Sequence, residues 1–164
     1  MKRLFLSLFV ASGMFSVASA ATGVVSQQNL TLALAGKLAD SAITACSAEK
    51  YNVAVTVVDR AGTPLVMKKM DNAGPHTPEA SRMKAWTAIT TKNSSEAVMK
   101  AAQANAGAAN MGDIPGLLLL AGGVPLKVGD EVVGAIGIGG APGGHLDQAC
   151  ALEAIKAHQS ELGG

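Results

Sequence analysis

Aromatic side chains are almost missing from this sequence. All three phenylalanines fall within the first 15 residues, so Tyr51 and Trp86 are the only aromatic residues beyond that point. The charge is nearly balanced, with 13 Lys and Arg against 12 Asp and Glu. Nucleic-acid binding depends on a basic surface, and single strands also need aromatic platforms on which bases stack. The sequence therefore predicts that nucleic acid is not a partner.

The familiar catalytic motifs are missing as well. The chain contains no Cys-x-x-Cys, no His-Glu-x-x-His and no Gly-x-Ser-x-Gly, and no nucleophile has an evident base beside it. Asp59 and Asp71 stand at turn positions, where aspartate commonly caps the backbone with its own side chain. The residues therefore do not predict an enzyme that works with its own side chains alone.

Long apolar runs are confined to the N-terminus. The chain begins with Met1-Lys2-Arg3, continues with an apolar stretch interrupted by serines, and reaches Ala18-Ser19-Ala20. A basic start, an apolar segment shorter than the roughly 20 residues of a membrane span and a small-residue cleavage motif are typical of a secretory signal peptide. We expect cleavage after Ala20, so that residues 21–164 act in a periplasm or outside the cell with no membrane span. This remainder has a net charge of −1, because two basic and no acidic residues are removed.

Periodicity and turn residues predict the elements of the first half. An apolar stripe with a capping Ser26 predicts a helix to about Lys50. Two β-branched or apolar runs around an Asp-Arg-Ala-Gly turn predict a hairpin of strands. Thr77 followed by Pro78 predicts the cap and first residue of another helix. The expected elements are strands at Val53–Val58 and Leu65–Lys69, and helices at Pro78–Thr90 and from Ser94 or Ser95 to Asn105.

The second half repeats the strand pattern with more glycine. Three short apolar runs are separated by Gly-Gly and Gly-Asp turns, and a glycine-rich segment precedes a last helix. The predicted elements are strands at Leu117–Ala121, Pro125–Val128 and Glu131–Ile138, and a helix from about Leu146 to Gln159. We therefore expect an α/β fold in which helices cover both faces of one five-stranded, mainly antiparallel sheet. Gly134, Gly137 and Gly139 are expected to permit close packing rather than phosphate binding.

Several motifs, in a fixed order along the chain, carry a resemblance to a known family. They are Val57-Val58-Asp59-Arg60-Ala61-Gly62, Met70-Asp71-Asn72-Ala73-Gly74-Pro75-His76-Thr77, Ser81 to Ala88, Ile114-Pro115-Gly116, Ala121-Gly122-Gly123-Val124-Pro125 and Val133 to Gly144 with Asp147 and Cys150-Ala151. The sequence resembles the GlcG/HbpS-like family, which includes the C-terminal domain of PduO-type cobalamin adenosyltransferases. The resemblance implies that residues 21–164 form one haem-binding domain, a profilin-like α/β/α sandwich that assembles into dimers or larger rings.

The family resemblance directs attention to the loop from Asp71 to Thr77. His76 is the candidate iron ligand, because a loop imidazole can reach a ligand and borderline iron accepts its nitrogen. Methionines would supply apolar contacts, and cations or free amides would hold the haem carboxylates. The candidate haem-binding residues are Met70, Asp71, His76, Thr77, Arg82, Met83, Lys84, Gly143 and Gly144. His145 and His158 remain alternatives for iron, as does a haem held at a subunit interface by Thr77 or rim charges.

Two further expectations concern the covalent and quaternary structure. Cys46 and Cys150 fall on the first and last helices, and export would permit a disulfide that closes a loop of about 100 residues. The family's cysteine in the last helix is often an unpaired core residue, so both states stay open. Strands at Leu117–Leu120 and Val132–Ile138 are apolar on both faces, which predicts a homo-oligomer.

The combined prediction is an exported haem-binding protein for capture, storage or sensing of haem. Two alternatives remain. One is an enzyme that degrades haem or oxidises another small substrate, with the chemistry carried by the haem iron. The other is an oligomeric scaffold without a ligand.

Overall fold

The structure, a computed structural model, describes residues 23–163. The predicted signal peptide and its cleavage after Ala20 lie outside the described residues. The elements follow one another along the chain in the order α1, β1, β2, α2, α3, η1, β3, β4, α4 and η2. The α-helices are α1 (Leu32–Ala48), α2 (Thr77–Thr91), α3 (Ser95–Ala104) and α4 (Gly144–Ala157). The strands are β1 (Ala54–Asp59), β2 (Pro64–Lys69), β3 (Gly123–Val128) and β4 (Glu131–Gly139), and the 3-10 helices are η1 (Ala106–Asp113) and η2 (Gln159–Leu162).

The sheet has four strands in the order β2-β1-β4-β3, and every neighbouring pair is antiparallel. The α/β class is thus confirmed, but the predicted fifth strand at Leu117–Ala121 is wrong. Side chains of the adjacent helices take the hydrogen bonds that a strand would give its neighbour. The Leu118 amide donates to Thr87 Oγ1 at 2.8 Å, and Ser95 Oγ donates to the Leu120 carbonyl at 2.6 Å. Helix side chains therefore satisfy the backbone of this apolar run, and the run forms a connecting segment instead of a strand.

Helix α1 begins later than its apolar stripe suggested. The predicted cap, Ser26, lies in an exposed extended segment, and Thr31 caps the helix by accepting a hydrogen bond from the Leu34 amide at 3.2 Å. Asn29 Oδ1 accepts from the Arg60 amide at 3.0 Å, and the Leu30 amide donates to the Val133 carbonyl at 3.2 Å. These long-range hydrogen bonds hold the chain extended up to residue 30, so the helix begins only after this residue.

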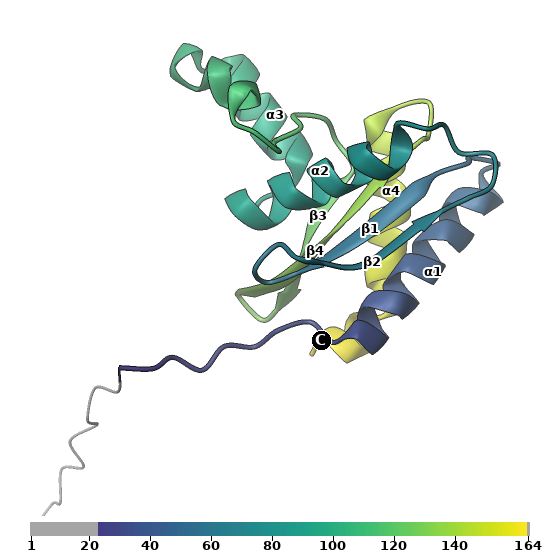
Figure 1. Cartoon of the computed structure of the whole chain (residues 1–164), viewed down its shortest axis with the longest axis horizontal. Coiled ribbons are helices and arrows are strands. Elements are labelled where there is room, and N and C mark those ends of the chain that lie inside the picture. The colour runs from purple at the N-terminus through teal and green to yellow at the C-terminus, as the bar shows by residue number, and fades with distance from the viewer. Residues whose placement is uncertain (1–22, 164) are drawn as a thin grey trace, which may run out of the picture.

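Helices cover both faces of the sheet, as Figure 1 shows for α2 on one side and for α1 and α4 on the other. Along β4, Ile136 and Ile138 belong to the main aliphatic core with α1 and α4. Ala135 belongs to a smaller cluster with Ala85 of α2. This alternation follows from the two-residue period of a strand. A disulfide between Cys46 and Cys150 joins α1 to α4.

The glycines of β4 serve close packing, as the sequence predicted. A Cβ at Gly137 would lie 2.1 Å from the Ser81 carbonyl oxygen and 2.5 Å from the Ala85 amide nitrogen. A Cβ at Gly134 would lie 2.6 Å from the Val58 carbonyl oxygen. The backbone of α2 therefore lies directly on β4, closer than any larger residue would allow.

Helix α3 and the 3-10 helix η1 project beyond one end of the sheet (Figure 1). Ser94 caps α3 by accepting from the Ala97 amide at 3.2 Å, which confirms one of the two predicted starts. None of the residues in η1 is buried. Within residues 23–163, no helix is long and apolar enough to cross a membrane.

Candidate functional site

Two loops that are distant in sequence meet at one end of the sheet. One loop, residues 70–76, connects β2 to α2, and the other, residues 140–143, connects β4 to α4. The strand register aligns Lys69 with Ala54 and Ala54 with Gly139, so β2 and β4 end level with each other. Figure 1 shows the start of α2 and the loop before α4 at this end. The fold therefore brings the predicted 71–77 loop close to the glycine-rich segment.

His76 lies exposed at the start of α2 and packs against its own loop. A Cβ at Gly74 would lie 2.9 Å from His76 Cε1 and 3.1 Å from Nδ1, so the imidazole covers a glycine. The predicted role of Thr77 as the helix cap is wrong, because His76 occupies the cap position and Thr77 is the first helical residue. The Thr77 amide and hydroxyl both donate to the Gly74 carbonyl, at 3.1 and 2.8 Å. Thr77 thus closes the loop that presents His76.

Arg82 lies one turn further along α2, and Glu79 already neutralises its charge. Arg82 Nε and Nη2 donate to the two Glu79 carboxylate oxygens at 2.9 and 2.6 Å. This forked hydrogen bond lowers the pKa of Glu79 and raises the pKa of Arg82. Both side chains are partly exposed, so the pair is accessible to solvent and an incoming anion would compete with Glu79.

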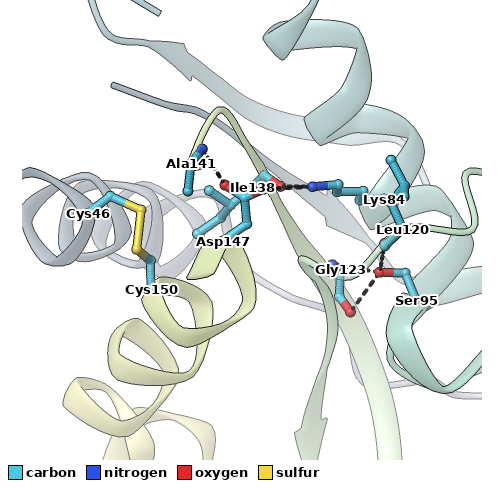
Figure 2. A network of polar contacts seen from close by, with 9 residues as sticks. All are labelled: Cys46, Lys84, Ser95, Leu120, Gly123, Ile138, Ala141, Asp147 and Cys150. Carbon is cyan, nitrogen blue, oxygen red and sulfur yellow. Dashed lines mark hydrogen bonds and ion pairs between the residues drawn. A yellow bond between two sulfur atoms is a disulfide. The ribbon is translucent and has the colours of Figure 1, made fainter. Parts of the chain in front are cut away.

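Lys84, which the sequence offered with Arg82 as a cation for the haem carboxylates, is buried. Only 5% of its side chain is exposed, and its ammonium donates to Asp147 Oδ2 at 2.7 Å and to the Ile138 carbonyl at 2.9 Å (Figure 2). Asp147 Oδ1 also accepts from the Ala141 amide at 2.9 Å. Burial raises the pKa of Asp147, while the Lys84 ammonium opposes that shift. Lys84 therefore fastens α2 to α4 and to the end of β4.

The two methionines and Asp71 point in different directions. Met70 is partly buried against the core on the α1 side, and its sulfur accepts from the Val53 amide at 3.3 Å. Met83 lies half-buried on α2, and Asp71 is exposed in the loop. Of these three, Met83 shares the helix that carries the candidate ligand, whereas Met70 supports the base of the loop.

The second loop repeats the local arrangement of the first. Gly143 caps α4, and a Cβ there would lie 2.8 Å from His145 Cε1, so an exposed imidazole again covers the glycine two residues before it. Gly144 packs on the chain, because its Cβ would lie 2.6 Å from the Ala121 carbonyl oxygen. Gly74-Pro75-His76 and Gly143-Gly144-His145 thus share an imidazole that covers the glycine two residues earlier, although His76 is the cap of α2 and His145 lies in the first turn of α4.

The third histidine has a structural environment. His158 Nε2 lies 2.9 Å from Ser41 Oγ, and its Nδ1 lies 2.9 Å from Glu161 Oε1. These contacts tie the end of α4 to α1 and to η2. Within residues 23–163, no group of three or more His, Cys, Asp or Glu side chains could hold a metal ion.

Five surface hollows in the described part of the chain are lined by residues other than the 71–77 loop. One of them, mostly apolar, lies between α1 and α4 beside Cys150 and Tyr51, with a volume of about 410 Å³. None of these five hollows includes His76, whose side chain is exposed.

Two functional features of this end escaped the sequence analysis. Lys69 Nζ donates to the carbonyls of Met70 and Asp71, at 3.1 and 3.4 Å, and so lies over the start of the loop. Nothing in the sequence distinguishes Lys69 from Lys68, because only the strand register decides which face each one occupies. The buried Lys84–Asp147 pair was also missed, although an aspartate in the first turn of a predicted helix is a recognisable signal.

Comparison with known proteins finds solved structures of similar fold. A double mutant of HbpS from Streptomyces reticuli is 34% identical, with a TM-score of 0.77 over 89% of this chain and 98% of that one. Protein ORFY of Klebsiella pneumoniae is 26% identical, with a TM-score of 0.81 over 87% and 99%. A complex of PduOC with haem is 25% identical, with a TM-score of 0.70 over 79% and 94%. The family described as haem degrading protein HbpS-like matches residues 30–156, and the chain belongs to this HbpS-like family.

Proposed function

We propose that this protein binds haem outside the cytoplasm, for haem capture, storage or sensing, with His76 as the axial ligand. The observation that carries the proposal is membership of the HbpS-like family over residues 30–156. The similarity to the complex of PduOC with haem supports the choice of ligand. Nucleic acid is not expected as a partner, because the sequence has balanced charge and almost no aromatic residues.

The residues around the first loop fit such a ligand. A haem site requires an axial donor, apolar walls and positive groups near the carboxylates. His76 offers an exposed imidazole, and Thr77 fixes the loop that carries it. Met83 offers an apolar contact on the same helix, and the start of α2 adds the positive end of a helix dipole. Bound haem iron would supply redox chemistry, and the role of the chain would be to hold and orient it.

The open shape of the candidate site supports a homo-oligomer. Haem is a flat apolar plate, and tight small-molecule sites bury most of the ligand. The His76 side chain is exposed, and five hollows of the described surface are lined by other residues, so we expect one copy to leave much of a bound haem exposed. We propose that a second copy of the chain covers the haem.

Export rests on two features. The first 20 residues have the composition of a signal peptide, with cleavage after Ala20. The Cys46–Cys150 disulfide is a bond that persists in oxidising compartments and is rare in a reducing cytosol. Comparing the mass of the protein recovered from periplasm or medium with that of the full chain tests this proposal.

The test of haem binding is a titration of haemin into wild type, His76→Ala and His145→Ala. The two histidines are matched, because each covers a glycine at the start of a helix. We expect His76→Ala to shift the Soret band and weaken binding about tenfold or more, as loss of an axial ligand removes a metal bond. His145→Ala should match wild type. An unchanged spectrum in His76→Ala, or a shift only in His145→Ala, would contradict the assignment of His76.

Haem degradation is the second candidate function, and the family description favours it. With reductant and oxygen present, a degrading enzyme would lose its Soret band and release iron. A binding protein would keep the band under the same conditions.

A further inference from the structure

The charges around the His76 loop differ in how well they are balanced. Arg82 is held by both oxygens of Glu79, and Lys84 is buried against Asp147. Lys69, by contrast, has no carboxylate within ion-pair distance among residues 23–163. Within the described residues, no carboxylate therefore neutralises this ammonium beside the loop.

Two backbone carbonyls position this ammonium. Lys69 Nζ donates to the Met70 carbonyl at 3.1 Å and to the Asp71 carbonyl at 3.4 Å. An ammonium has three N–H donors, so at least one stays available for a ligand. Carbonyl oxygens orient the group without cancelling its charge. Lys69 is thus held in place and exposed to solvent, which are the conditions under which an anion can bind.

The strand register shows that Lys69 faces the same side of the sheet as the start of α2. Lys69 pairs with Ala54, and Ala54 pairs with Gly139. A Cβ at Gly139 would meet Ala80 of α2 at 3.3 Å and the Thr77 carbonyl at 3.5 Å. Directly paired residues point to the same face of a sheet, so Lys69, Gly139 and the first turn of α2 share one face.

The neighbouring lysine gives an internal control. Lys68 pairs with Val55, which belongs to the core on the α1 side, and its ammonium forms an ion pair with Asp40 of α1. Two adjacent lysines on one strand therefore lie on opposite faces of the sheet. Asp40 of α1 neutralises Lys68, whereas Lys69 contacts the backbone at the start of the loop that carries His76.

We propose that Lys69 is the anion-binding residue of the haem site and binds a propionate carboxylate. The assignment rests on the proposed haem-binding function, and it replaces Lys84, which the fold buries. It makes the site selective for tetrapyrroles that carry free carboxylates, because a charged pair with Lys69 forms only with an ionised group. Lys69 contributes affinity and orientation, whereas His76 supplies the bond to iron.

The test compares Lys69→Met with Lys68→Met, using haemin and haemin dimethyl ester as probes in the same mixed solvent. Methionine keeps an unbranched apolar side chain and removes the charge. We expect Lys69→Met to bind haemin about fivefold more weakly, the size of an exposed ion pair, with an unchanged Soret position. Lys68→Met should bind haemin as wild type does. The dimethyl ester, which has no carboxylates, should bind wild type and Lys69→Met equally.

Each other result overturns the assignment. Wild-type haemin affinity in Lys69→Met, or an equal loss of affinity in Lys68→Met, would show that haemin binding does not depend specifically on the Lys69 ammonium. An equal loss for the dimethyl ester would show that the substitution damages the loop. If wild type binds no haemin, the proposed function fails together with this inference. If binding depends on His76 but not on Lys69, only the role of Lys69 is wrong.

Discussion

The two faces of the sheet are covered in different ways. On the α1 and α4 face, aliphatic side chains such as Leu38 and Ile136 pack together, and a disulfide links the two helices. On the α2 face, a smaller apolar cluster is accompanied by buried polar groups, which include Thr77, Ser81, Lys84 and Thr87. The same sheet therefore has one apolar cover and one hydrogen-bonded cover.

Hydrogen bonds of the buried polar groups fix the position of α2 on the sheet. Apolar burial is non-directional, whereas a buried hydrogen bond loses most of its energy when its partner shifts. Ser81 Oγ lies 2.7 Å from Thr56 Oγ1, and Thr87 Oγ1 accepts from the Leu118 amide at 2.8 Å. Such contacts set the height and rotation of α2 on the sheet. The helix whose start presents His76 is thus positioned by directional contacts as well as by apolar packing.

Removing the disulfide should produce the largest loss of stability. The Cys46→Ala/Cys150→Ala variant opens a loop that spans a sequence separation of 104, and chain entropy predicts a loss of about 4 to 5 kcal/mol in the free energy of unfolding. Haemin affinity should stay at the wild-type level, because the bond lies on the opposite face from His76. Urea unfolding measures the loss. Two free thiols in denatured, non-reduced wild type would contradict the disulfide itself.

The second-largest loss of stability should come from breaking the buried ion pair between Lys84 and Asp147 on the α2 face. Lys84→Met leaves the Asp147 carboxylate buried without its ammonium, which typically lowers the free energy of unfolding by about 3 to 5 kcal/mol. Urea unfolding at neutral pH gives the value.

The matched control for that variant is Lys84→Met/Asp147→Leu, in which no charge stays buried. We expect the double variant to be more stable than Lys84→Met alone, because replacing both ions by apolar groups removes the desolvation penalty. If the stability losses of Lys84→Met and Asp147→Leu, measured singly, added up to the loss of the double variant, Lys84 and Asp147 would not act as a pair.

The hydroxyl pair between β1 and α2 should give a smaller and asymmetric effect. Ser81→Ala leaves the buried Thr56 hydroxyl without this partner, which should lower the free energy of unfolding by about 1 to 3 kcal/mol. Thr56→Val should cost less, because Ser81 still donates to the Pro78 carbonyl at 2.8 Å. Thermal unfolding of both variants tests the order. A larger loss in Thr56→Val would contradict it.

The sequence predicted local elements well and long-range choices poorly. The hairpin of β1 and β2 and the helices α2 and α3 follow from turn residues, caps and periodicity, which act within a few residues. The segment Leu117–Ala121 was misassigned because its hydrogen bonds go to Thr87 and Ser95, more than 20 residues away. No local pattern carries that information.

The same limit applies to the candidate site. His76 and its loop could be named from the resemblance, and the structure presents the imidazole at the start of a helix. Lys84 was predicted to pair with a haem carboxylate, because a lysine on a helix is ordinarily solvated, and only the fold reveals that it is buried against Asp147. Lys69 was overlooked because strand register alone separates it from Lys68.

The smallest predicted effect concerns the start of α1. It tests whether the helix is capped by Thr31, as the structure shows, or by Ser26, as the sequence predicted. Thr31 accepts from the Leu34 amide, whereas Ser26 is exposed in the extended segment before the helix. Thr31→Ala should lower the free energy of unfolding by about 1 kcal/mol, the usual value of a helix cap, and Thr31→Ser should restore most of it. Ser26→Ala should leave stability unchanged. Urea unfolding of the three variants decides between the two starts, since a loss in Ser26→Ala with none in Thr31→Ala would place the cap at residue 26. Because this cap acts on the apolar cover, none of these variants should change the Soret band of the haemin complex.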